Sequence, residues 1–223
     1  MFVYRKELGY YFATPVAYVV VGLYLLAVSL FLWVIPGTWN VVESGYAQTD
    51  GLFQLSPWLL MLLCPALTMR LFAEERVSGT WNLLIAKKVA VWRIVVSKFL
   101  AAWTLTAIAI LPCVVHFFLV SGIAEPAGNV DGAQFAGSMA GLLLMSLSFT
   151  AIGLVAASVT RNQIVAFILG AVTCFILYWI LIQDHYESIS RGVIDLRDLL
   201  FFLSVAAIGI ILTILIIERI TKK

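Results

Sequence analysis

Serine and histidine side chains lie inside long apolar runs of the sequence. Together such side chains could act as a nucleophile and its general base. His116 lies in one such run, and a later run contains Ser138, Ser146 and Ser148. A Ser/His pair of this kind would indicate an intramembrane protease. No G-x-S-x-G motif or other oxyanion element accompanies these serines. We therefore predict no catalytic residue and expect His116 to be hydrogen-bonded and to face protein.

Metal ligation has little support in the sequence. Asp184-His185-x-Glu187 contains the residue types that bind metals, but polar connections outside a membrane often have this composition. Cys64, Cys113 and Cys174 all fall in apolar runs and lack CxxC or Cys/His spacing. We predict no metal site, no disulfide framework and no cofactor bound by this chain.

A charged connection between two apolar runs is the strongest candidate for a functional element. A glycine in it can end one helix, and the threonine that follows can cap the next. That second helix would have an apolar face between charged flanks, and such a face needs a partner. From the residues alone, lipid headgroups and another protein are equally suitable partners. The apolar face of that helix would present Trp81, Leu84 and Ile85.

The elements that position these residues must cross a membrane. The chain has 223 residues, of which 63% are hydrophobic and 12% charged, whereas a soluble domain is about half apolar and about a quarter charged. This composition excludes a soluble enzyme and a disordered chain. We predict an all-α polytopic membrane protein with one transmembrane domain over residues 1–223. Its six expected spans are residues 15–35, 57–72, 94–120, 133–159, 163–182 and 199–217.

Residues 1–14 mix aromatic side chains with Arg5, Lys6 and Glu7. This pattern is typical of a short amphipathic helix that lies in the cytoplasmic membrane interface. Pro15 is expected at the first position of span one, and Pro57 at the first position of span two, where a missing N–H costs little. Pro112 predicts a kink within span three.

The basic residues predict the orientation of the spans. Six spans place both termini on the same side of the membrane. If that side is the cytoplasm, only Arg191 and Arg197 of the 14 basic residues lie outside. The positive-inside rule therefore favours cytoplasmic termini. We expect a multi-pass protein of the bacterial inner membrane that contacts lipid, and no feature indicates nucleic-acid binding.

Small residues recur at every fourth position near the start of span four. Ala133, Gly137 and Gly141 form this series, which permits close approach of another helix. The residues leave open whether that helix belongs to the same subunit or to a second subunit.

Several segments resemble ABC-2 type permeases. The pattern Glu74-Glu75-Arg76-x-x-Gly79-Thr80-x-x-Leu83-Leu84 is similar to the coupling-helix region of that family, and residues 5–18 resemble its elbow helix. The more specific resemblance is to the gliding-motility-associated permeases of the GldF type. The segments that carry it are residues 53–58, 65–70, 126–131 and 162–167.

The resemblance implies a permease subunit that depends on a separate ATPase. The chain has no G-x-x-x-x-G-K-[ST] motif and no Gly-Lys dipeptide, so we expect it not to be an enzyme itself. ATP and Mg²⁺ would be bound by separate ABC ATPase subunits. The resemblance implies that six residues would contact those subunits, namely Glu74, Glu75, Arg76, Gly79, Thr80 and Trp81. The charges would give register, and Trp81 would act as an anchor.

The same resemblance implies a second six-span permease subunit, in a heterodimer rather than the alternative homodimer. It also implies a role in gliding motility or the associated secretion, with export as the favoured direction. Two other functions stay open, a non-transporting membrane scaffold of such a machine and an intramembrane enzyme. The sequence does not identify the substrate.

Overall fold

The computed structural model describes residues 2–77, 90–126, 129–190 and 195–221. Within these ranges the chain is helical and contains no strand, and six helices are long and apolar enough to cross a membrane. The all-α, six-span prediction is thereby confirmed. The candidate spans are Pro15–Trp33, Asp50–Arg76, Val91–Ile123, Gly132–Val159, Gln163–Ser190 and Leu196–Thr221.

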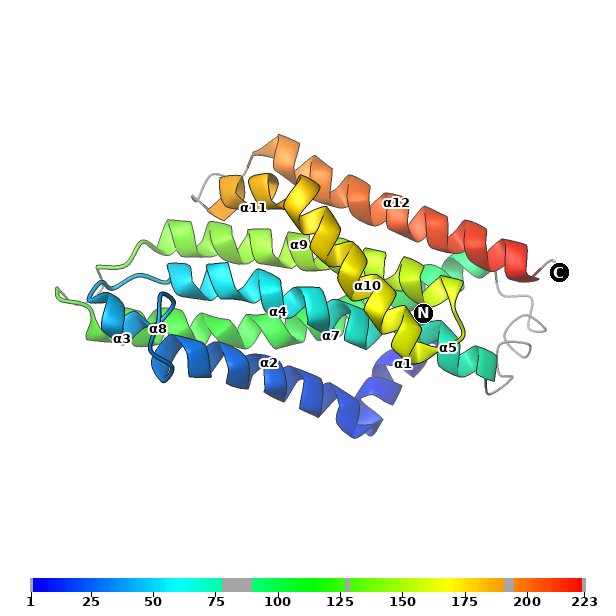
Figure 1. Cartoon of the computed structure of the whole chain (residues 1–223), viewed down its shortest axis with the longest axis horizontal. Coiled ribbons are helices and arrows are strands. Elements are labelled where there is room, and N and C mark those ends of the chain that lie inside the picture. Colours follow the sequence, from blue (N-terminus) through cyan, green and yellow to red (C-terminus); the bar gives the residue numbers. More distant parts are fainter. Residues whose placement is uncertain (1, 78–89, 127–128, 191–194, 222–223) are drawn as a thin grey trace.

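The long helices run roughly along one axis of the molecule (Figure 1). Both termini lie at one end of this bundle, together with α1 and α5, and we call it the termini end. The opposite end carries α3, α8 and α11. The described elements are α1 (Phe2–Ala13), α2 (Pro15–Trp33), α3 (Val41–Ser44), α4 (Asp50–Thr68), α5 (Arg70–Val77), α7 (Val91–Ile110), η1 (Leu111–Cys113), α8 (Val114–Ile123), α9 (Gly132–Val159), α10 (Gln163–Leu177), η2 (Tyr178–Ile182), α11 (Gln183–Ser190) and α12 (Leu196–Thr221).

Helix α9 is the centre of the bundle. Its most apolar stretch is 72% buried, whereas the corresponding stretch of α2 is 22% buried. Helices α4, α7, α10, α11 and α12 all contact α9. Small residues allow this close packing, because a Cβ at Gly209 of α12 would come within 2.9 Å of Ala151 on α9. The outer helices leave apolar faces exposed, as lipid-facing helices do.

The second span begins earlier than the sequence predicts. Helix α4 starts at Asp50, and Pro57 lies inside it as a buried residue. Asp50 lies in the first turn of the helix, where its negative charge complements the helix dipole. Neighbouring helices cover the position of Pro57, and such packing makes an internal proline tolerable in a membrane helix. After a turn at Met69 the same span continues as α5.

The third and fifth spans both change their helix type along their length. At Pro112, where the sequence predicts a kink, the α-helix of the third span changes to the short 3-10 turn η1 between α7 and α8. The fifth span runs on through the π-helical turn η2 into α11. The expected polar loop after residue 182 is therefore partly helical, and Asp184, His185 and Glu187 lie on α11.

Candidate functional site

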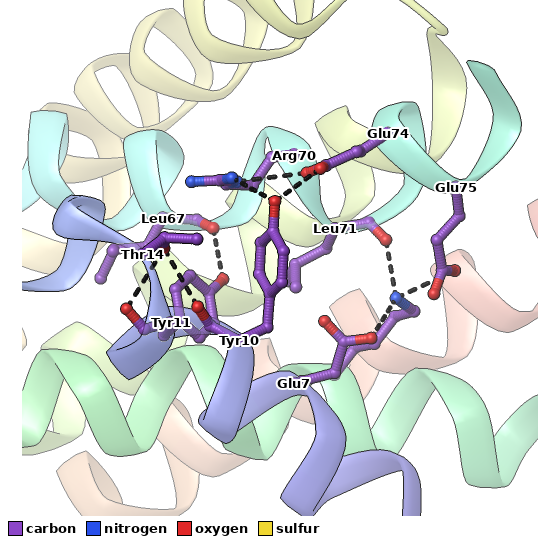
Figure 2. A network of polar contacts seen from close by, with 10 residues as sticks. Glu7, Tyr10, Tyr11, Thr14, Leu67, Arg70, Leu71, Glu74 and Glu75 are labelled. Carbon is purple, nitrogen blue, oxygen red and sulfur yellow. Dashed lines mark hydrogen bonds and ion pairs between the residues drawn. The ribbon is translucent and has the colours of Figure 1, made fainter. Parts of the chain in front are cut away.

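A fully buried lysine joins three helices at the termini end. Lys98 of α7 is 0% exposed. Its Nζ atom donates a hydrogen bond of 2.8 Å to Oε1 of Glu7 and one of 2.7 Å to the Leu71 carbonyl. The same nitrogen lies 3.0 Å from Oε2 of Glu75. Figure 2 shows Glu7, Leu71 and Glu75 converging on this ammonium nitrogen.

This arrangement compensates the cost of burying a charge. An isolated buried ammonium would be strongly unfavourable, and ion pairs with hydrogen bonds offset that cost. Glu7 belongs to α1, Glu75 and Leu71 to α5, and Lys98 to α7. The cluster therefore links the helix before span one, the end of span two and the start of span three.

Local sequence explains why Lys98 points inward. It lies on the buried stripe of α7 that also contains Ile94, Val95, Ala101 and Ala102. The spacing of these residues follows the helical period. The sequence places Lys98 among the basic residues of the cytoplasmic side and in the segment that resembles the coupling-helix region, but it predicts no role for Lys98 in a site. Its position on an apolar stripe was the signal that could have identified it as a buried ion-pair partner.

A weaker ion pair extends the cluster toward solvent. The Nζ atom of Lys6 donates to Oε1 of Glu75 at 3.5 Å, so Glu75 lies between two lysines. The Lys6 side chain is 48% exposed, and solvent screens an ion pair of this kind. Arg5, which precedes Lys6 on α1, is exposed.

Tyr10 and Arg70 form a second contact between α1 and α5. The Tyr10 hydroxyl donates to Oε1 of Glu74 at 2.6 Å and accepts from Nη2 of Arg70 at 2.8 Å. The Arg70 guanidinium also lies over the Tyr10 ring, 5.0 Å from its centroid. The hydrogen bond to the Glu74 carboxylate raises the pKa of Tyr10, because ionisation of the phenol would break that bond.

A hydrogen bond from Tyr11 connects α1 to the end of α4. The buried hydroxyl of Tyr11 donates a 2.6 Å hydrogen bond to the Leu67 carbonyl. Burial raises the pKa of Tyr11, so the phenol stays a neutral donor. Together these contacts border a small cavity of about 210 Å³ between α1 and α5. Helix α1 is thus held by specific polar contacts as well as by its buried side chains Val3 and Tyr11.

Arg76 differs from its neighbours because two of its buried nitrogens lack a partner in the described part of the chain. Among the described residues, no hydrogen-bond acceptor meets its buried Nε and Nη2 atoms. Arg161, in the turn between α9 and α10, is close enough to affect Arg76 electrostatically. Two positive charges therefore lie near each other at the termini end.

The six expected contact residues fall into three groups. Glu74 and Glu75 have partners within the chain, and Glu75 is buried. Arg76 lies on the same helix with unsatisfied nitrogens among the described residues. Gly79, Thr80 and Trp81, and with them the expected coupling helix, lie outside the described residues.

One member of the small-residue series on α9 makes a close contact within the chain. A Cβ at Gly141 would come within 2.9 Å of Ile189, so α11 packs directly on this position. Gly137 is buried and Ala133 is exposed. The intramolecular alternative therefore accounts for Gly141, and a contact of Ala133 with a second subunit stays a prediction.

The serine and histidine residues do not come together in the described part of the chain. His116 is buried, and its Nδ1 atom accepts a 2.9 Å hydrogen bond from Trp33 Nε1. The three serines donate instead to backbone carbonyls, those of Ser190, Leu143 and Phe202.

At the end opposite the termini, His185 Nδ1 lies 2.7 Å from Asp198 Oδ1. The His185 ring stacks on Phe201.

Comparison with known proteins identifies the family. The family model described as "ABC-2 family transporter protein" matches residues 35–190. This segment contains α4, α5, α7 and α9, and therefore most of the buried core and the Lys98–Glu75 contact. No curated protein matches the chain. Since the match extends over well more than half of the sequence, the chain belongs to the ABC-2 family of transporter proteins.

Proposed function

We propose that this ABC-2 permease couples ATP hydrolysis by separate ATPase subunits to the movement of a substrate, in the direction of export. The observation that carries the proposal is the buried cluster of Glu7, Glu75 and Lys98. It joins α5, which leads into residues 78–89, to α1 and to α7. The ATPase subunits bind ATP and Mg²⁺, and this chain supplies the membrane pathway.

The cluster of Glu7, Glu75 and Lys98 connects α1, α5 and α7 tightly enough for movement of one helix to displace the others. A partner that displaces the segment after α5 also displaces Glu75, and Glu75 acts on Lys98 across the ion pair. Separating a buried charge from its partner costs about 3–5 kcal/mol, so α1, α5 and α7 move together rather than independently. Motion at the termini end is then transmitted along the spans that begin or end there.

Arg76 is suited to direct contact with the ATPase. An acidic group on the partner would be attracted by the positive charges of Arg76 and Arg161 together. In this proposal Arg76, Gly79, Thr80 and Trp81 make the contact. Glu74 and Glu75 act through their contacts inside the chain.

The cellular setting follows from the sequence. The distribution of basic residues supports cytoplasmic termini in a bacterial inner membrane. The resemblance of residues 53–58 and 162–167 to gliding-motility permeases supports a role in gliding or the associated secretion. That type also supports a heterodimer with a second six-span subunit.

Purification from native membranes in mild detergent tests the partner assignment. We compare the wild-type protein with a variant that carries Arg76→Glu and Trp81→Ala, and identify bound proteins by mass spectrometry. Arg5→Glu is the matched control, since it reverses an exposed arginine charge at the same end. We expect an ABC ATPase with the wild type and the control but not with the double variant. Absence of an ATPase from all three would overturn the proposal.

The rate of ATP hydrolysis separates transport from a scaffold role. The variant with Glu7→Gln, Glu75→Gln and Lys98→Met removes all three charges of the cluster at once. We expect its reconstituted complex to assemble and to hydrolyse ATP at the rate of the isolated ATPase. A complex whose rate equals that of the wild type would contradict coupling through this cluster.

A further inference from the structure

A larger cavity lies at the end of the bundle opposite the termini. Its volume is about 490 Å³, which is within the range of small-molecule sites. Helices α4, α9 and α11 and the turn η2 surround it, and Trp39 borders it from the connection before α3. A Cβ at Gly51 would come within 2.6 Å of the Trp39 carbonyl oxygen, so the glycine allows this connection to lie against the start of α4.

Aromatic rings form much of the cavity wall. Trp58 of α4 lies 6.2 Å from the Tyr178 ring and 6.1 Å from the Trp179 ring, measured between centroids. Trp39 and Tyr186 add two further rings. Trp179 is 53% exposed, although it is one of the largest apolar side chains of the chain. Its exposure leaves aromatic surface available to a ligand.

Two carboxylates contribute negative charge to the same cavity. Asp50 accepts a 3.3 Å hydrogen bond from the Gln134 side-chain amide, and Glu187 accepts a 2.8 Å hydrogen bond from that of Gln183. These amides orient the carboxylates without neutralising them. Among the described residues, no basic side chain lines the cavity, and neither carboxylate has an ion-pair partner.

We propose that this cavity binds an organic cation of the alkylammonium class. A cation is attracted both to the faces of tryptophan and tyrosine rings and to the two carboxylates. The described residues contain no group of three or more side chains that could hold a metal ion. The volume and the aromatic wall therefore fit a bulky organic cation better than a bare metal ion. The charges of Asp50 and Glu187 repel an anion.

This site goes beyond the proposed function and does not depend on it. Binding needs only this chain, because every side chain named here belongs to it. An alkylammonium group can reach the cavity as a free molecule or as the headgroup of a lipid, and the chemistry recognised is the same in both cases.

Equilibrium dialysis with radiolabelled choline tests the proposal on the purified full chain in a maltoside detergent. Unlabelled 3,3-dimethylbutan-1-ol has the shape of choline without its charge and serves as the competitor. We expect saturable choline binding and displacement by the neutral alcohol only at concentrations about tenfold higher or more than unlabelled choline requires. Equal displacement by the two compounds would overturn the proposal, as would displacement by glucose at the concentration at which choline competes.

Variants locate the binding to the cavity. Asp50→Asn with Glu187→Gln keeps the side-chain shapes, and we expect choline affinity to fall by about tenfold or more. Trp58→Leu is expected to weaken binding similarly. The matched controls are Glu125→Gln, an exposed carboxylate outside the cavity, and Trp92→Leu, an exposed tryptophan on α7. Binding that the cavity variants leave unchanged contradicts the assignment.

A further competition measurement distinguishes a free cation from a lipid headgroup as the ligand. Dihexanoyl-phosphatidylcholine carries the same headgroup on a short lipid. If it displaces choline at lower concentration than unlabelled choline does, the cavity receives a lipid headgroup. If it competes less well, the cavity receives a free cation. Either result supports an alkylammonium site.

Discussion

The Nζ atom of Lys98 lies 2.8 Å from Oε1 of Glu7, although 91 positions separate the two residues in the chain. This contact joins the N-terminal helix to the third span inside the protein rather than at its surface. Glu75 approaches the same nitrogen from the end of the second span. The termini end of this permease is thus organised around one buried positive charge.

Removing that charge is expected to destabilise the protein strongly. Lys98→Met keeps an unbranched side chain but takes away the shared partner of Glu7 and Glu75, at a cost of about 3–5 kcal/mol. The temperature of half-unfolding in detergent should fall accordingly. Adding Glu7→Gln and Glu75→Gln to Lys98→Met should restore most of the loss, because no uncompensated charge then remains. A triple variant as unstable as Lys98→Met would show that the ion pairs are not the cause.

The two tyrosines of α1 are expected to differ in importance. Tyr11→Phe leaves the buried Leu67 carbonyl without its donor and should cost about 1–3 kcal/mol. Tyr10→Phe affects an exposed contact and should cost no more than about 1 kcal/mol. Denaturation of the two variants under the same conditions checks this order. The reverse order would contradict the structural role assigned to Tyr11.

The free energy of unfolding is expected to fall at alkaline pH because Tyr11 is buried. Burial raises the pKa of Tyr11 in the folded state above its value in the unfolded chain. The stabilisation is therefore present below the ordinary tyrosine pKa of about 10 and is lost as the pH rises further. Unfolding of the wild type and of Tyr11→Phe, measured from pH 8 upward, checks this. Above about pH 10 the wild type should lose stability more steeply than Tyr11→Phe, and parallel curves would contradict the assignment.

Gly153 is expected to tolerate no larger side chain. A Cβ there would overlap Oγ1 of Thr68 and would lie 3.2 Å from the Pro65 Cα atom, so α4 and α9 would be forced apart. Gly153→Ala should destabilise the protein by about 1–3 kcal/mol. Gly22→Ala on α2 is the control, since a Cβ there meets nothing within 4 Å. Equal effects of the two substitutions would argue against tight packing between α4 and α9.

Chemical labelling checks the orientation of the termini. The three native cysteines are buried and free, so they should react slowly with a membrane-impermeant maleimide. A cysteine introduced as Glu125→Cys lies at the end opposite the termini and should react in intact spheroplasts. Arg5→Cys should react only after the membrane is opened. Labelling of Arg5→Cys in intact spheroplasts would reverse the proposed topology.

Composition and residue patterns alone determined the class of the fold. With 63% hydrophobic and 12% charged residues, the chain cannot cover itself with polar groups, and apolar runs of span length form helices because lipid satisfies no backbone hydrogen bond. The role of Pro112 was also predictable, since proline interrupts a helix at its own position. The start of α4 was not, because packing around Pro57 overrides the local preference for a helix start.

Only the tertiary structure decided which charged residues meet. Glu7, Glu75 and Lys98 belong to three separate segments, and nothing in their local sequence relates one to another. The same holds for Asp50 and Glu187, which border one cavity although they lie on α4 and α11. Hydrophobic periodicity determines which face of each helix is buried, but it does not determine which helices become neighbours. That choice depends on the packing of the whole bundle around α9, where small residues such as Gly153 and Gly141 permit close approach.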